Sequence, residues 1–432
     1  MPRPSAQKIA IIFDICPLFY YTIIMKRLFI IVILFFTGMT IFSQDMSVYT
    51  AEFTRTDGTF EERLVVLEHV RDAKLTGIAE FYHNALRYFL TRAPDIRSST
   101  EHTAAEKSAV ILCQGLGAEK YTAAATDIWQ IVDWSDVVKS NVNDANAMQA
   151  ALIALGQINA QEFVPHIVQR LNNFNTQTIN NPETKRRVQM AVIGCINALE
   201  ALKDIRGYRP VFFVTVGSYD PPVREIARNA LPNITEDPGE VIIEIINDTS
   251  SDPRVKLTAW REMLRTRAQG ASKAKVAAVA LATGWNYSTN NKNFQTNLRE
   301  MRKEAIDAIR QFGVSDNSVY ENLEKSYSNN FINNSPDYDE IMLTLNALTA
   351  VRSDEAVELL HKFLRELNAR RRNGPWARKE RRLFEWVVSC IGRTGTQSTE
   401  IRILLTQIQR TSAYTSQEQA MAANALKELG AR

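Results

Sequence analysis

Proline and glycine are scarce in this sequence, with 14 Pro and 17 Gly among 432 residues. Few positions therefore interrupt regular elements, and long helices are favoured. The length exceeds what one ordinary compact core requires, so we expect either two or three domains or an extended repeat array.

Cysteine is also scarce, and the three that follow the first 44 residues are far apart: Cys113, Cys195 and Cys390. Three widely separated cysteines exclude a disulfide framework. Cysteine and histidine show no zinc spacing either. Each of these cysteines lies in an apolar helical pattern, so we expect buried thiols that pack as small hydrophobic groups. A disulfide bond between one pair of them remains an alternative if the compartment is oxidising.

The motifs of common enzyme classes are missing. The sequence has no GxSxG, GxxxxGK or GxGxxG, and none of its five His is followed by Glu, so no HExxH occurs. We therefore predict a protein that is not an enzyme, with no catalytic residues, no cofactor and no metal-binding motif. A metal site made of carboxylates that are far apart in the sequence remains an alternative.

The first 44 residues differ from the rest. Met25 is followed by Lys26-Arg27, by the apolar run Leu28–Phe36 and by a more polar end at Thr37–Gln44. This order predicts a cleaved secretory signal peptide over residues 25–44 and upstream sequence that is not native protein over 1–24. The protein would then be periplasmic or secreted. The alternative is an uncleaved segment that anchors the protein in the membrane.

The net positive charge of the chain comes from residues 1–44. Residues 1–44 hold four of the 51 basic and one of the 48 acidic residues, so the remainder has 47 of each. A neutral mature chain gives no indication of a protein that binds nucleic acid or a membrane surface, and we expect no nucleic acid as a partner. The membrane would be met only transiently, through the signal peptide.

A two-helix unit recurs along the chain. Its clearest copy is Ala147–Leu171, AMQAALIALGQINAQEFVPHIVQRL, where Ala147, Ala151 and Leu155 share one helix face. We expect Gly156 to end this first helix and Gln161–Leu171 to form the second.

Similar small or apolar positions, which we call anchors, return at intervals of 32 to 49 residues between the last members of each set. The other sets are Ser108/Leu112/Leu116, Ala191/Cys195/Leu199, Val223/Ala227/Leu231, Val255/Ala259/Met263, Glu304/Ala308/Phe312, Leu345/Leu348, Leu383/Val387/Ile391 and Met421/Ala425/Leu429. That interval is typical of two-helix solenoid repeats.

The stretch AALIALGQINAQEFVPHIVQRL resembles the HEAT repeat, in the short variant called the phycobilisome-lyase type. The turns Asp220-Pro221-Pro222-Val223-Arg224 and Asp252-Pro253-Arg254-Val255-Lys256 are similar to the turn that leads into the inner helix of that repeat. The resemblance implies an all-α fold, a right-handed α-α superhelix of the HEAT/armadillo type. It covers roughly 105–432 as eight to nine helical hairpins. Only the repeat matches, so no lyase activity is carried over.

The segment 45–104 is expected to form an N-terminal cap that contains a helix pair. Its first helix would open at Thr59-Phe60-Glu61-Glu62, which matches the capping box.

One local concentration of charge stands out, with seven basic residues and one acidic residue within Arg370–Arg382. Asn373-Gly374-Pro375 predicts a turn between two helices at its centre. The residues proposed to bind are Arg370, Arg371, Arg372, Trp376, Arg378, Lys379, Arg381 and Arg382, which we call the basic cluster.

Two functions follow from the sequence. The first is an exported scaffold or adaptor that binds protein partners, of unspecified identity, through the concave face of its inner helices. The alternative is a binder of an anionic cell-envelope polymer or lipid headgroup through the basic cluster. A solvated, charged loop is the plainer interpretation of that cluster.

Overall fold

The computed structural model describes residues 46–55, 58–138, 144–332 and 336–430. Within these ranges every regular element is a helix and no strand occurs. None of the helices in the described ranges is long and apolar enough to cross a membrane. The predicted upstream segment 1–24 and signal peptide 25–44 lie outside the described residues.

The chain divides into two compact units. The first contains the residues up to Phe163 together with Ile179–Ala198. After a short helix at 46–53, its helices are α2 (Phe60–Asp72), α3 (Ala79–Arg92), α4 (Ser99–Ala118), α5 (Ala125–Trp134), α6 (Ala145–Gln157) and most of α8 (Pro182–Leu202).

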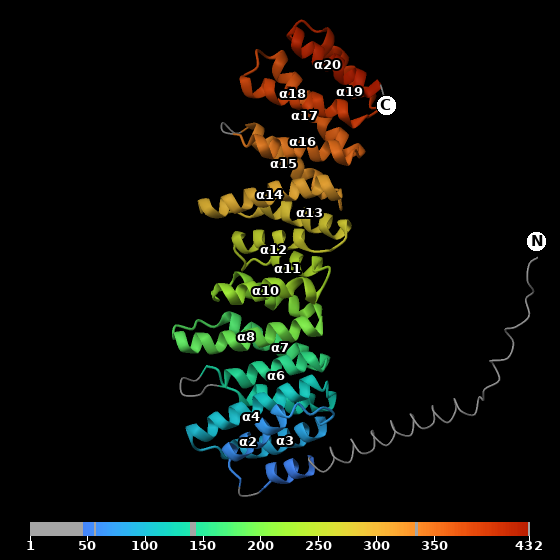
Figure 1. The fold of residues 1–432 in the computed structure, drawn as a ribbon. Coiled ribbons are helices and arrows are strands. Elements are labelled where there is room, and N and C mark those ends of the chain that lie inside the picture. Colours follow the sequence, from blue (N-terminus) through green and yellow to red (C-terminus); the bar gives the residue numbers. More distant parts are fainter. Residues whose placement is uncertain (1–45, 56–57, 139–143, 333–335, 431–432) are drawn as a thin grey trace, which may run out of the picture. The chain divides into compact units, whose positions relative to one another are not determined.

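The second unit contains Val164–Thr178 and the chain from Leu199 onward, and its helices follow one another in chain order (Figure 1). They are α7 (Val164–Thr176), α9 (Tyr208–Val216), α10 (Pro221–Ile234), α11 (Gly239–Asn247), α12 (Pro253–Arg265), α13 (Gly270–Asn286), α14 (Lys292–Phe312), α15 (Ser318–Ile332), α16 (Tyr338–Val351), α17 (Asp354–Arg372), α18 (Arg378–Thr394), α19 (Thr399–Arg410) and α20 (Ser416–Gly430).

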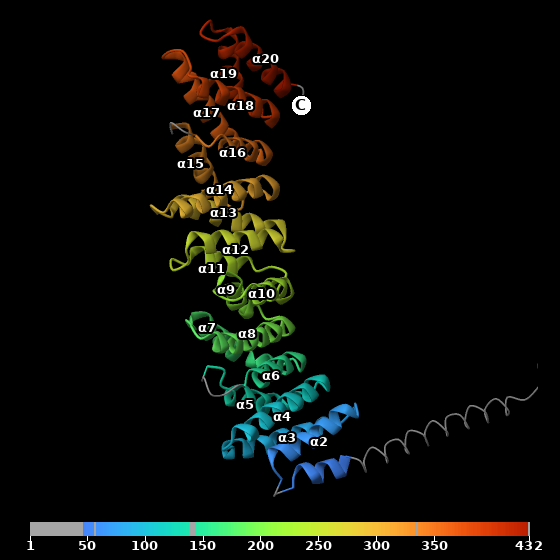
Figure 2. The same cartoon turned by 60° about the vertical axis from the view of Figure 1, so that its left-hand side comes forward.

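Within each unit the helices form two rows (Figure 2). The anchor row consists of α2, which packs on α4, and of the helices that carry the anchors, α4, α6, α8, α10, α12, α14, α16, α18 and α20. In the first unit α4 packs on α6. In the second unit α12 packs on α14, α14 on α16, α16 on α18 and α18 on α20. The odd-numbered helices, here the partner row, pack on the anchor row and on one another. This arrangement confirms the predicted all-α, solenoid-type helical-repeat fold.

The anchors are mostly buried, as a helix face with small and apolar residues at a spacing of four requires. Val255, Glu304, Phe312 and Met421 are only partly buried. The polar exception, Glu304, accepts hydrogen bonds from Arg261 of α12, with 2.7 Å between Glu304 Oε1 and Arg261 Nη2. A carboxylate at an anchor position thus links two neighbouring helices of the row.

The expectation that Gly156 ends its helix is wrong. Gly156 is buried within α6, and the left-handed residue that follows the helix is Asn159, at φ 58°. The amide N–H of Ala160 donates to the carbonyl of Leu155 at 3.0 Å, which is the Schellman pattern of helix termination. Asparagine tolerates this conformation better than most side chains do, so it replaces glycine here.

Glycine instead permits close approach between anchor helices. A Cβ added to Gly117 of α4 would lie 3.1 Å from Cα of Ala154 in α6. A Cβ on Gly392 of α18 would lie 3.2 Å from Cα of Ala425 in α20. The small residues of the repeat therefore set the spacing between neighbouring helices.

The three cysteines of the described chain are buried, as predicted. Burial raises the pKa of the Cys113 thiol to about 12, because a thiolate would lose its hydration there. A thiol of this kind contributes to packing.

The predicted helix starts are largely confirmed. Thr59 and Glu62 form the capping box at α2, with the Glu62 amide N–H donating to Thr59 Oγ1 at 3.2 Å and the Thr59 N–H donating to Glu62 Oε2 at 3.1 Å. Pro221 and Pro253 occupy the first positions of α10 and α12. Their fixed φ suits a helix start and removes an N–H that would have no partner in the helix.

Asp252 caps α12, because its Oδ1 accepts from the Val255 amide at 2.9 Å. We expect Asp252→Ala to lower the free energy of unfolding by about 1 kcal/mol, since one N–H at the helix start loses its acceptor. Asp252→Asn keeps an acceptor and serves as the matched control. Urea denaturation followed by circular dichroism measures both, and equal losses for the two variants contradict the capping role.

Candidate binding surfaces

A groove of about 450 Å³ lies across α2, α4 and α6 in the first unit. Val110, Ala150 and Ile153 provide apolar contact area, whereas Gln114 and Gln149 present amide groups. Acidic and basic side chains from α2 and α4 also line the groove. A neutral groove of mixed polarity suits a peptide surface better than a strongly charged polymer.

Glu106 is the most unusual residue of this groove. It is 7% exposed, and its Oε1 has no hydrogen-bond partner within the described part of the chain. Burial raises the pKa of this carboxyl, and a hydrogen bond from Asn146 partly opposes the shift. Burying a carboxyl oxygen without a hydrogen-bond donor lowers the stability of the fold.

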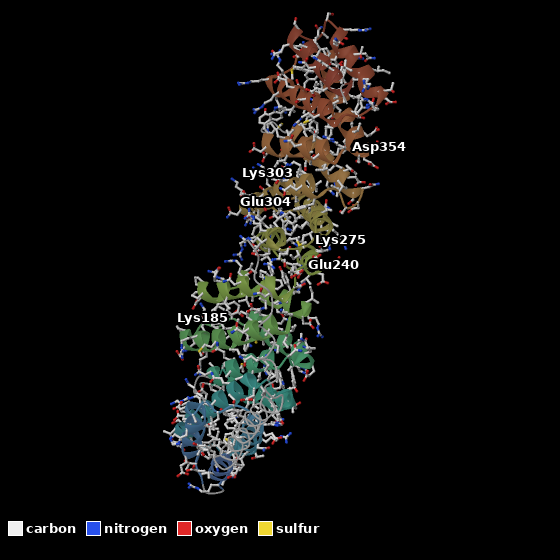
Figure 3. The ribbon with its side chains drawn as sticks, turned by 45° about the vertical axis from the view of Figure 1, so that its right-hand side comes forward. Lys185, Glu240, Lys275, Lys303, Glu304 and Asp354 are labelled. Atoms are coloured by element: carbon white, nitrogen blue, oxygen red, sulfur yellow. The ribbon has the colours of Figure 1, made fainter. Side chains whose placement is uncertain are left out.

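A second groove, of about 270 Å³, lies across α12, α14 and α16 in the second unit. Leu264, Ala308 and Leu343 supply its apolar residues. Its charged lining includes Lys303 and Glu304, which Figure 3 places beside one another. Both grooves therefore open over consecutive helices of the row that includes the anchors, although they belong to different units.

A third hollow, of about 410 Å³, lies between α11, α12 and α13. Lys256 at its edge is buried, and burial lowers the pKa of its ammonium group. Lys256 Nζ donates to the backbone carbonyls of Ile246 and, at 2.7 Å, Asp248. The lysine thus caps the end of α11.

The basic cluster spans the end of α17, a loop and the start of α18. Arg370, Arg371 and Arg372 occupy the last turn of α17, where cations are favoured by the helix dipole. Arg378 and Lys379 occupy the first turn of α18, where cations are disfavoured. Glu380 offsets part of this cost, because its Oε2 accepts from the Ala377 amide at 2.9 Å.

One half of the basic cluster faces α19 and α20. Trp376 packs on Phe384 and Tyr414, with ring centroids 4.6 and 5.5 Å apart. Arg371 lies over the same aromatic group, with its Cζ 5.5 Å from the Trp376 ring. The sequence proposed Trp376 as a binding residue, and the structure gives its indole a packing role between α18 and the loop that follows α19.

Arg381 and Arg372 also belong to this half. Arg381 Nε lies 3.3 Å from Oε1 of Glu418, a 2%-exposed residue of α20. Arg372 Nη2 donates to Gln407 Oε1 at 3.4 Å. Glu418 lies 37 residues after Arg381 in the chain, so the sequence could not identify it as the partner.

The other half faces the end of α15 and the start of α16. Arg370 Cζ lies 4.2 Å from the Phe331 ring centroid, and Lys379 Nζ donates to the Phe331 carbonyl at 2.7 Å. Arg382 lies against both Tyr338 and Trp386, with its Cζ 4.7 and 4.6 Å from the two ring centroids. The structure therefore divides the basic cluster between two neighbouring repeats.

Two histidine–aspartate pairs in the first unit were not expected from the sequence. His83 Nε2 lies 2.7 Å from Asp127 Oδ2, and His102 Nε2 lies 2.5 Å from Asp144 Oδ1. Each pair joins neighbouring repeats, from α3 to α5 and from α4 to the residue that precedes α6. Across the described ranges, no group of three His, Cys, Asp or Glu is arranged to hold a metal ion.

No protein-family model matches the chain, and no curated protein matches it. Among solved structures, the chain is similar to the N-terminus of TSC2 at 13% identity, over 89% of this chain and 88% of that one, with a TM-score of 0.28. It is also similar to a circular tandem repeat protein with novel repeat topology, at 13% identity, over 90% and 82% of the chains, with a TM-score of 0.18. These scores are too low to carry an argument about function.

Proposed function

We propose that this chain is an exported, non-enzymatic scaffold built of HEAT-type repeats that binds protein partners through the face of its anchor row. The observation that supports this most is the position of the two grooves, each of which crosses three successive helices on the side of that row. Grooves between repeated helices offer a partner several contact points of mixed polarity.

Export is the proposal for localisation, with the mature chain in the periplasm or secreted after cleavage near Gln44. Sequencing the amino terminus of the protein purified from its native cells tests this proposal. A start near Gln44 or Asp45 supports it, and a start at Met1 on cytoplasmic protein contradicts it.

The binding face is tested by affinity capture from the envelope fraction, with mass spectrometry of the retained proteins. Gln114 and Gln311 are exposed and line the two grooves, whereas Gln130 is exposed on α5 of the partner row. We expect Gln114→Arg or Gln311→Arg to reduce retention of a specific partner about tenfold, because the longer, charged side chain obstructs a groove. The matched variant Gln130→Arg should retain that partner, and an equal loss in all three variants contradicts the assignment.

The second candidate function is the binding of an anionic envelope polymer or lipid headgroup by the basic cluster. The observation in its favour is the exposure of Arg370, Arg372, Arg378, Arg381 and Arg382 around one inter-helix loop. The dependence of binding on salt concentration distinguishes the two candidate functions. Binding to an anion should weaken steeply between low and high ionic strength, and apolar contact with a protein should not.

A further inference from the structure

Arg382 is held in a fixed place by two aromatic rings. The rings of Tyr338 and Trp386 lie 6.0 Å apart at an interplanar angle of 88°, and Arg382 approaches both. Stacking on aromatic faces leaves the in-plane N–H groups of a guanidinium available to other acceptors. Because the side chain is already ordered, a ligand that binds it pays less conformational entropy.

Two further cations lie next to this position. Lys379 precedes Arg382 by three residues on α18, so the two side chains are neighbours on one helix face. Lys379 and Arg370 share Phe331, and the distances to its ring centroid are 5.8 Å from Lys379 Nζ and 4.2 Å from Arg370 Cζ. Three cations from two helices thus meet at one edge of the second unit.

Two acids lie beside Arg370, namely Glu366, four residues earlier on α17, and Glu380. Glu380 accepts from the Ala377 amide at 2.9 Å and lies 3.3 Å from Arg370. Asp337 and Asp339, on either side of Tyr338, both contact Lys303, at 3.2 and 3.5 Å. Because Glu366 and Glu380 offset the charge of Arg370, Lys379 and Arg382 supply the charge that attracts a multivalent anion more strongly than a single carboxylate.

An apolar residue borders the same edge. Ile332, which follows Phe331 in the chain, is 72% exposed, the largest exposure among the large hydrophobic residues of the described chain. An exposed aliphatic side chain beside several cations suits an anionic headgroup that is attached to apolar chains.

We propose that Arg370, Lys379 and Arg382 form a site for a phosphate group, here called the Phe331 site. The proposal rests on the second candidate function and assigns it to the half of the basic cluster that faces α15 and α16. Arg382 provides a planar pair of donors, and Lys379 and Arg370 add charge. The phosphate belongs either to a soluble ligand or to a lipid headgroup, and the chemistry at the site is the same for both.

The test uses two probes with the protein that begins at Asp45. One probe is glycerol 3-phosphate, and the other is phosphatidylcholine vesicles with and without phosphatidylglycerol. The site variant is Lys379→Gln/Arg382→Gln. The control variant, Arg410→Gln/Lys427→Gln, removes the same charge from exposed positions outside the basic cluster, at the end of α19 and in the last turn of α20. Circular dichroism confirms that each variant is folded.

We expect the site variant to bind the phosphate probes at least tenfold more weakly, and the control to bind them within about twofold of the unaltered protein. Arg382→Lys keeps the charge but loses the planar pair of donors, so we expect a loss of about threefold or more. Binding of glycerol 3-phosphate indicates a soluble ligand. Binding only to phosphatidylglycerol vesicles, weakened by Ile332→Ser, indicates a lipid.

An equal loss in Arg372→Gln/Arg381→Gln, which alters the other half of the basic cluster, would overturn the Phe331 site, while anion binding by the cluster as a whole would stand. An equal loss in the control variant would overturn both. An unchanged affinity in Arg382→Lys would also contradict the assigned role of the planar donors. If the unaltered protein binds neither probe at low salt, both the site and the second candidate function are wrong.

Discussion

Replacing Ala151 by arginine is expected to lower the free energy of unfolding by about 4 kcal/mol, through overpacking and a buried charge. Ala151 has no exposed surface and lies at the centre of α6, on the face that packs against its neighbours. The larger side chain would have to displace α6 from the adjoining helices. Urea denaturation followed by circular dichroism should show an early transition for the first unit.

The matched substitution on the same helix is Gln157→Lys. Gln157 is exposed in the last turn of α6, where a cation is favoured by the helix dipole. We expect a change within about 0.5 kcal/mol. Similar shifts in both variants would show that the assigned face of α6 is wrong.

Glu340→Ala is expected to cost about 3 kcal/mol, because it leaves the mostly buried Arg302 without its carboxylate. The pair joins α14 to α16, with 2.8 Å between Arg302 Nε and Glu340 Oε1 and 3.0 Å between Nη2 and Oε2. The Glu340 side chain is 1% exposed and that of Arg302 is 13% exposed, so water cannot easily replace the lost partner. Thermal and urea unfolding of the second unit measure the loss.

A double substitution separates the loss of a partner from the net value of the pair. In Arg302→Met/Glu340→Leu no buried charge remains without a partner, so we expect stability to recover to within about 1 kcal/mol of the unaltered protein. The Arg302 guanidinium also lies 4.0 Å from the Trp285 ring centroid and donates to the Gly284 carbonyl at 3.0 Å. A double variant as unstable as Glu340→Ala would show that these other contacts dominate.

Charged residues link successive helices of the anchor row. Arg261 of α12 pairs with Glu304 of α14, and Arg381 of α18 pairs with Glu418 of α20. The partner row has similar links, such as Lys275 with Glu240, whose Nζ and Oε1 are 2.5 Å apart (Figure 3). Pairing of this kind uses equal numbers of both charges.

The repeat could be predicted from the sequence because it depends on local spacing. Ala151 and Leu155 share a helix face whatever the rest of the chain does, and burial follows from their size and polarity. The ends of the helices were harder to predict from the sequence, since Asn159 rather than Gly156 adopts the left-handed conformation. Both residue types tolerate that conformation, so the sequence alone did not decide between them.

The basic cluster shows where reasoning from the sequence ends. The turn at Asn373-Gly374-Pro375 and the local density of charge were evident from the order of residues in the sequence. The packing of Trp376 on Tyr414 and the pairing of Arg381 with Glu418 join residues more than thirty positions apart. Only the stacking of repeats brings such residues together, so no local pattern could have divided the cluster into two halves.

The central claim is that partners bind on the face of the anchor row, and site-specific photo-crosslinking tests it most directly. A photoreactive amino acid is placed at Gln114 or Gln311 in the two grooves, or at Gln130 on the partner row, and the protein is irradiated in its native envelope fraction. The account predicts that the same partner is crosslinked from the groove positions and not from Gln130. Crosslinks to that partner from Gln130, with none from the grooves, would contradict it.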